Sequence, residues 1–217
     1  MPKEKPHNGE LSPQDIAAGM NAASRNALRL LDDAQFLAEK GRYPTACSLA
    51  ILAIEEAGKM PLLRLIATAR NQTELKKAWH GYRSHQTKNT MWIVGKLVAD
   101  GARTLTEFGG LFDPESDHPA LLDALKQLGF YTDCYKEGFW SEPVEIIGET
   151  LTETILSIAK ILCRGQEISI REVELWVRHV GNNQTPSALI AFFAAMEEEG
   201  FADKRIDDIR KFVLGEP

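Results

Sequence analysis

The fold is decided by the segment Ala50–Met60, AILAIEEAGKM, in which two adjacent glutamates and a lysine interrupt a run of apolar residues. From Ala46 to Ile54 the chain is apolar on nearly every side of a helix, which is typical of a helix at the centre of a bundle. An unpaired carboxylate inside such a helix is costly, because burial removes it from water. The sequence therefore predicts that Glu55 or Glu56 is paired with a cation on another helix.

Cations that could pair with these glutamates come from two places in the sequence. Lys59 is four residues after Glu55 and three after Glu56, so on a helix it can reach either carboxylate. The segment His80–Lys88, HGYRSHQTK, supplies more cations, and its last histidine and its lysine share a helix face because they are three residues apart. We expect a polar pocket between the second and third helices, made of Glu55, Glu56, Lys59, Arg83, His85 and Lys88.

The chemistry of this pocket has two interpretations. In the first, His85 is a general acid or base near neutral pH, Arg83 binds a phosphate, and Glu56 completes the catalytic group. The surrounding polar network would then be Glu55, Lys59 and Lys88. Such a set suits cleavage of an RNA phosphodiester by its own 2′-hydroxyl, and it needs no metal or other cofactor. In the second interpretation, the ion pairs only fix the register of two packed helices.

Helical periodicity extends through most of the chain, and no segment of useful length alternates apolar and polar residues as a strand would. Ser12, followed by Pro13 and Asp15, is typical of a helix start, and Pro61 predicts a bend just after the glutamates. Helices of about twenty residues with short links favour an antiparallel bundle. The predicted helices run from Ser12 to Gly41, from Tyr43 to Ala69, from a start between Thr73 and Ser84 to Gly101, from Ala120 to Tyr135, and from Val144 to Cys163.

The last part of the chain has shorter, well-capped helices. Ser169 with Glu172 has the pattern of a capping box, and Thr185-Pro186 opens a further helix. The predicted helices here are Ser169–Gly181, Thr185–Gly200 and Asp203–Val213. We therefore divide the chain into a loose N-terminus at 1–11, a helical bundle at 12–164 and a small C-terminal helical appendage at 165–217.

Composition limits the location and the partners. The 217 residues carry a net charge of −6, which argues against an extended nucleic-acid surface. Three cysteines lie far apart without a CxxC pair, as expected for reduced thiols. The apolar run from Ala46 to Ile66 is interrupted by charges, and the first residues lack an apolar signal core. We expect a cytoplasmic protein with no membrane partner.

Three segments occur in an order that resembles the AbiV family of abortive-infection proteins, within the HEPN superfamily. They are GRYPTACSLAILAIEEAGKM, YRSHQTK and LGFYTDCYKEGFWSEP, and the resemblance covers residues from about 23 to 145. It implies an all-α, HEPN-like antiparallel helical bundle, to which residues 165–217 add the appendage. It also implies a homodimer with an antiviral defence role against bacteriophage, and a phage or host protein, or RNA, as the partner.

Many HEPN proteins are ribonucleases with an Arg-x(4–6)-His motif. In this chain Arg83 and His85 are two residues apart, Arg171 and His179 are eight apart, and the motif's spacing does not occur. The resemblance therefore leaves three functions to compare. They are an abortive-infection effector acting through the polar pocket, a metal-independent endoribonuclease, and a non-catalytic helical interaction module.

Overall fold

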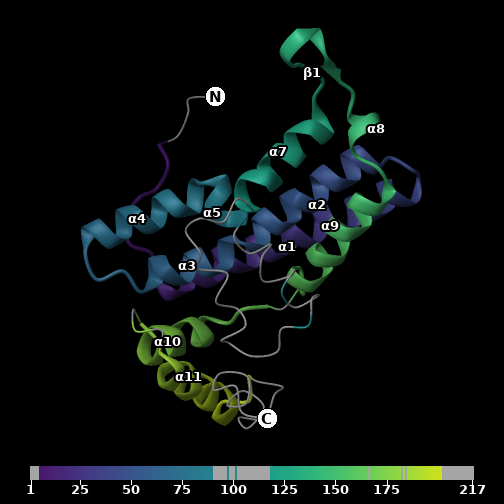
Figure 1. The fold of residues 1–217 in the computed structure, drawn as a ribbon. Coiled ribbons are helices and arrows are strands. Elements are labelled where there is room, and N and C mark those ends of the chain that lie inside the picture. The colour runs from purple at the N-terminus through teal and green to yellow at the C-terminus, as the bar shows by residue number, and fades with distance from the viewer. Residues whose placement is uncertain are drawn as a thin grey trace.

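The computed structural model describes residues 5–89, 97, 101, 118–165, 167–181, 183 and 185–201. Within these ranges the architecture is the predicted all-α bundle with a short two-stranded hairpin (Figure 1). The described elements, in chain order, are α1 (Pro13–Glu39), α2 (Tyr43–Ala57), α3 (Lys59–Ala67), α4 (Gln72–Arg83), α5 (His85–Asn89), α7 (His118–Phe130), β1 (Asp133–Cys134), η2 (Lys136–Gly138), β2 (Trp140–Ser141), α8 (Pro143–Ile146), α9 (Glu149–Leu162), α10 (Ile170–His179) and α11 (Pro186–Glu198).

Helix α2 lies at the centre of the bundle and packs against α1, α7 and α9 (Figure 1). Ile51 and Ile54 of α2 are completely buried, because neighbouring helices cover this segment on all sides. One apolar core joins the four helices, with Leu31 from α1, Leu122 from α7 and Ile155 from α9. The last turn of α2, which carries the two glutamates, therefore ends inside the protein.

The start of α1 is the predicted one. Asp15 donates its backbone N–H to Oγ of Ser12 over 3.1 Å, and its carboxylate accepts from the backbone N–H of Ser12 over 3.3 Å. Pro13 occupies the first turn, where its missing N–H is not needed. The hydrogen bonds from Ser12 hold the pKa of the Asp15 carboxyl below its usual value.

The predicted helix from Tyr43 to Ala69 divides into α2 and α3 at Gly58. The bend near the glutamates is confirmed, but it falls three residues before Pro61. Proline at that position cannot donate to the carbonyl of Ala57. Glycine lets the backbone of α5 come close, because a Cβ at Gly58 would lie 2.2 Å from the carbonyl oxygen of Lys88. This close approach places α5 beside the end of α2.

The third predicted helical region is broken at Ser84, where the backbone is extended. Helix α4 ends at Arg83, and α5 begins at His85 with its third backbone N–H, that of Thr87, donated to the Ser84 hydroxyl. An extended residue changes the direction of the chain, so side chains on either side of Ser84 face different neighbours. The predicted continuation toward Gly101 lies outside the described residues, apart from isolated positions.

Helix α7 begins two residues before its predicted start and ends at Phe130. It lies against α2 at Gly129, where a Cβ would be 2.1 Å from Oγ of Ser48. That hydroxyl donates to the carbonyl of Lys126 over 3.1 Å, which joins the two helices. The chain then forms a hairpin in which Asp133 pairs with Ser141, a strand pair that the sequence did not predict because each strand has only two residues.

The predicted helix from Val144 to Cys163 is two helices, α8 and α9. The break lies at Ile147 and Gly148, which both have extended backbones. Ile147 is buried in the α2 core, and glycine is a poor residue for a helix interior. The break thus turns an apolar side chain inward at the cost of helix continuity.

The helix α10 packs on α1 and α3, and α11 packs on α10 (Figure 1). Ser169 accepts from the backbone N–H of Glu172 over 3.0 Å, as predicted for the cap. The Glu172 carboxylate, however, pairs with Arg64 of α3 at 2.7 Å and does not complete the capping box. The boundary of the appendage at residue 165 stays a prediction, and the helix predicted at Asp203–Val213 lies outside the described residues.

Candidate functional site

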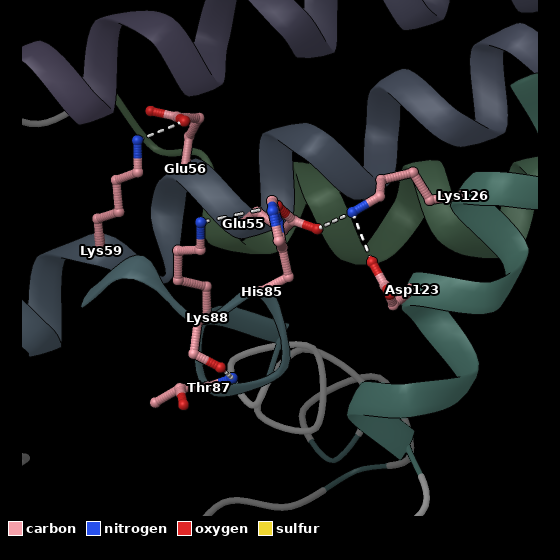
Figure 2. Close-up of polar contacts among 9 residues, drawn as sticks. Glu55, Glu56, Lys59, His85, Thr87, Lys88, Asp123 and Lys126 are labelled. Atoms are coloured by element: carbon pink, nitrogen blue, oxygen red, sulfur yellow. Dashed lines mark hydrogen bonds and ion pairs between the residues drawn. The ribbon is translucent and has the colours of Figure 1, made fainter. Parts of the chain in front are cut away.

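The carboxylate of Glu55 is the centre of a polar cluster between α2, α5 and α7. Glu55 lies in the last turn of α2 and is only 2 % exposed. Figure 2 shows its side chain pointing toward the residues of α5 and α7. A carboxylate buried to this degree needs charged or hydrogen-bonding partners. The sequence prediction that one of the two glutamates is buried is met by Glu55.

Helix α5 supplies two of the partners. Nδ1 of His85 lies 2.6 Å from Oε2 of Glu55, and Nζ of Lys88 lies 3.9 Å from the same oxygen. The two residues share a face of α5, as their spacing predicts. Their exposure differs, because the His85 side chain is 57 % exposed and that of Lys88 only 9 %. The cluster therefore has a buried ammonium and an imidazole that reaches the surface.

Helix α7 supplies a partner that was not in the predicted pocket. Nζ of Lys126 lies 2.7 Å from Oε1 of Glu55 and 2.7 Å from Oδ1 of Asp123 (Figure 2). Lys126 is on the buried face of α7, which Leu122 and Gly129 also occupy. The sequence held one sign of this contact, because Lys126 has the helical spacing that puts it on the same face as Leu122 and Gly129. A buried ammonium on that face needs an anion as its partner.

The pKa values of Lys126 and Lys88 shift in opposite directions. Burial disfavours the charged form of Lys126, but hydrogen bonds to Asp123 and Glu55 outweigh this effect and raise its pKa. Burial lowers the pKa of Lys88, and the charge of Glu55 at 3.9 Å offsets it only in part. Lys126 is thus the firmly held counter-ion of Glu55, and Lys88 is a weaker one.

Glu56 and Lys59 form a separate ion pair. Nζ of Lys59 lies 2.6 Å from Oε1 of Glu56, and both side chains are partly exposed. The same ammonium lies 5.7 Å from the centre of the Tyr82 ring. Figure 2 shows this pair apart from the Glu55 contacts. Lys59 could reach either glutamate, and in the structure it pairs with Glu56. The carboxylate that contacts His85 is that of Glu55.

Arg83 points away from the cluster. Its guanidinium donates to Oδ1 of Asn8 over 2.7 Å and to the carbonyl of His7, and it stacks on Trp79 with 4.9 Å between Cζ and the ring centre. The extended backbone at Ser84 separates Arg83 from His85. The structure therefore brings His85, Lys88 and Glu55 together and places Arg83 beside the N-terminal segment.

A metal ion could in principle use ligand atoms of Glu55, His85 and Asp123, which lie within 4.8 Å of one another. The ammonium of Lys126, however, contacts both carboxylates at 2.7 Å and supplies the positive charge between them. We therefore assign no metal site to this cluster.

The arrangement has a definite chemical capacity. A buried carboxylate that accepts from one nitrogen of an imidazole orients the ring and leaves the other nitrogen for proton transfer. The geometry at His85 allows this arrangement, because Nδ1 lies 2.6 Å from Oε2 of Glu55 and the ring is largely exposed. The same contacts also fasten α5 and α7 to α2, so the cluster has a structural effect whatever its chemistry.

The fold is an all-α bundle of the HEPN type. Residues 15–164 match the model of the HEPN_AbiV family, described as AbiV, and the chain belongs to this family. The family suggests a defence role of the abortive-infection type. No curated protein and no solved structure matched the chain. Among the described residues, no helix is both long and apolar enough to cross a bilayer.

Proposed function

We propose that the chain is an abortive-infection-type antiphage effector that acts through His85 and the buried Glu55 cluster. The family supports the defence role. The contact of 2.6 Å between Nδ1 of His85 and Oε2 of Glu55 supports the place of action, because it presents an oriented imidazole at the surface. In this proposal Glu55 takes the role beside the histidine that was predicted for Glu56, and Arg83 has no part in the chemistry.

A second candidate function is metal-independent endoribonuclease activity. It is favoured by the same contact, because a histidine fixed through Nδ1 can exchange a proton through Nε2 with a 2′-hydroxyl or a leaving oxygen. The phosphate contact would come from Lys88 or from a second copy of the chain, since Arg83 is turned toward the N-terminal segment. Homodimerisation and a cytoplasmic location belong to the same proposal.

The test combines protection, cleavage and folding in one variant. We expect His85→Ala to keep its helical circular dichroism, because the ring is exposed, and to lose protection against phage in a plaque assay. Purified wild type and variant are then incubated with total RNA and with short single-stranded RNAs in the presence of EDTA. Cleavage by the wild type alone supports the nuclease.

Each other outcome selects a different function. Protection lost without cleavage by the wild type supports an effector that binds a phage or host component. Protection retained by folded His85→Ala contradicts action through this cluster and supports a helical interaction module. Light scattering of the wild type tests the dimer, and a strict monomer at micromolar concentration contradicts it.

A further inference from the structure

The contacts of Lys126 have a consequence for the proton positions on His85. A neutral imidazole carries its proton on Nδ1 or on Nε2, and the partner of Nδ1 decides which. If Glu55 is ionised, Oε2 can only accept, so Nδ1 must carry the proton and Nε2 keeps a free electron pair. If Glu55 is protonated, its O–H can donate to Nδ1, and the ring proton moves to Nε2. The ionisation of Glu55 therefore determines whether the exposed nitrogen accepts or donates a proton.

Glu55 is buried, so its charge depends on the partners that contact it. The residue is 2 % exposed, and removing a carboxylate from water disfavours its charge. Two cations oppose this effect. Lys126 contacts Oε1 at 2.7 Å, whereas Lys88 is 3.9 Å from Oε2, beyond hydrogen-bond distance. The greater part of the stabilisation of the anion thus comes from Lys126.

Lys126 is itself held in place. Asp123, one turn earlier on α7, accepts from Nζ of Lys126 over 2.7 Å, and the Lys126 side chain is 7 % exposed. The hydrogen bonds raise the pKa of Lys126, so the ammonium stays charged throughout the physiological range. Within the described ranges, the neighbouring charges Glu56 and Lys59 are paired with each other.

We propose that Lys126, anchored by Asp123, is a positioning residue that keeps Glu55 ionised and thereby holds His85 in the tautomer with its proton on Nδ1. The contacts run in one line from Asp123 through Lys126 and Glu55 to His85 and cross from α7 to α2 to α5 (Figure 2). In the neutral imidazole, Nε2 then keeps its free electron pair and is a proton acceptor. The use of this nitrogen rests on the proposed function, but the tautomer can be measured without any activity.

The test is a long-range ¹H–¹⁵N NMR correlation of the full chain labelled with ¹⁵N-histidine at neutral pH. Resonances of His85 are assigned by their loss in His85→Asn. We expect the Nδ1–H pattern in the wild type and in Lys126→Arg, which keeps the cation, and conversion of most of the His85 signal to the Nε2–H pattern in Lys126→Met. Lys59→Met is the matched control, because its carboxylate partner does not touch His85, and it should leave the pattern unchanged.

A second variant covers the case in which Lys126→Met does not fold. Lys126→Gln removes the charge but keeps an amide that can donate to Glu55 and Asp123, so we expect a folded protein with a smaller shift toward Nε2–H. An unchanged Nδ1–H pattern in Lys126→Met, or in Lys126→Gln where the former is unfolded, would overturn the proposal. So would an Nε2–H pattern in the wild type.

The two proposals fail in different ways. Conversion of the tautomer in Lys126→Met, together with full protection by His85→Ala, would leave the positioning role intact and remove the proposed function. An unchanged tautomer, together with loss of protection in folded His85→Ala, would leave the function intact and remove the positioning role of Lys126.

Discussion

Nζ of Lys126 lies 2.7 Å from Oε1 of Glu55, although the two residues are 71 positions apart in the chain. The pair joins the end of the central helix α2 to α7, and His85 contacts the other oxygen of the same carboxylate. One buried side chain therefore connects three helices and presents one exposed imidazole.

Glu55→Gln should destabilise the protein strongly. The change removes the negative charge and leaves the buried ammonium of Lys126 with Asp123 alone, and breaking a buried pair in this way costs about 3–5 kcal/mol. Urea unfolding followed by circular dichroism measures the difference. Glu56→Gln is the matched control, since its partly exposed pair with Lys59 is worth no more than about 1 kcal/mol. Equal losses in the two variants would contradict the central position of Glu55.

Gly58→Ala should also destabilise, by about 1–3 kcal/mol, the usual cost of inserting a methyl group into a well-packed region. The new Cβ would lie 2.2 Å from the Lys88 carbonyl oxygen, so α5 must move away from α2. Gly19→Ala serves as the control, because its Cβ would meet Leu63 at an ordinary 3.5 Å in the middle of α1. There alanine should stabilise the helix by about 0.5–1 kcal/mol. Thermal unfolding that ranks the two variants the other way would disprove the close contact.

The three cysteines should react with a maleimide at very different rates. Cys134 is exposed, whereas burial raises the pKa of Cys47 to about 12 and that of Cys163 to about 11. The thiolate is the reactive form, so Cys47 and Cys163 should stay protonated and unlabelled even at a pH of about 9, whereas the exposed Cys134 is accessible to the reagent. Mass spectrometry should find one label per native chain and three after denaturation. Rapid triple labelling of the native protein would show that the core is open.

Arg64→Ala should loosen the contact between α10 and α3. The guanidinium pairs with Glu172 at 2.7 Å and lies 4.7 Å from the centre of the Trp176 ring, so one side chain makes both contacts. Burial lowers the pKa of Arg64, and Glu172 offsets part of this effect. We expect faster hydrogen exchange in α10 with little change in α2. Arg29→Ala, which removes exposed contacts with Asp33 and Asn26 of the same helix α1, should change neither helix.

The sequence predicted the central helix and one half of the cluster. The apolar run that ends at Glu55 required burial of that segment, and a buried carboxylate required a cation. The spacing of His85 and Lys88 placed both on one face of a helix. These inferences depend on local periodicity and on the cost of an unpaired charge, and both can be evaluated from a single segment.

The other half of the cluster depends on which helices are neighbours, and periodicity does not contain that information. Asp123 and Lys126 have the spacing of an ordinary surface pair, and only the packing of α7 on α2 turns the lysine inward. Arg83 was grouped with His85 because they are close in sequence, but the extended Ser84 separates them. The short strands and the break at Ile147 were missed for a related reason, since each involves too few residues to form a pattern.

The most direct test of whether the protein acts through the His85 imidazole is phage protection by His85→Asn. The asparagine amide can donate to Glu55 from nearly the position of Nδ1, so the cluster and the fold should be preserved, but Nε2, the nitrogen proposed to exchange protons, is gone. At matched protein levels and with an unchanged melting temperature, we expect this variant to lose protection. Plaque formation suppressed as strongly as by the wild type would contradict it.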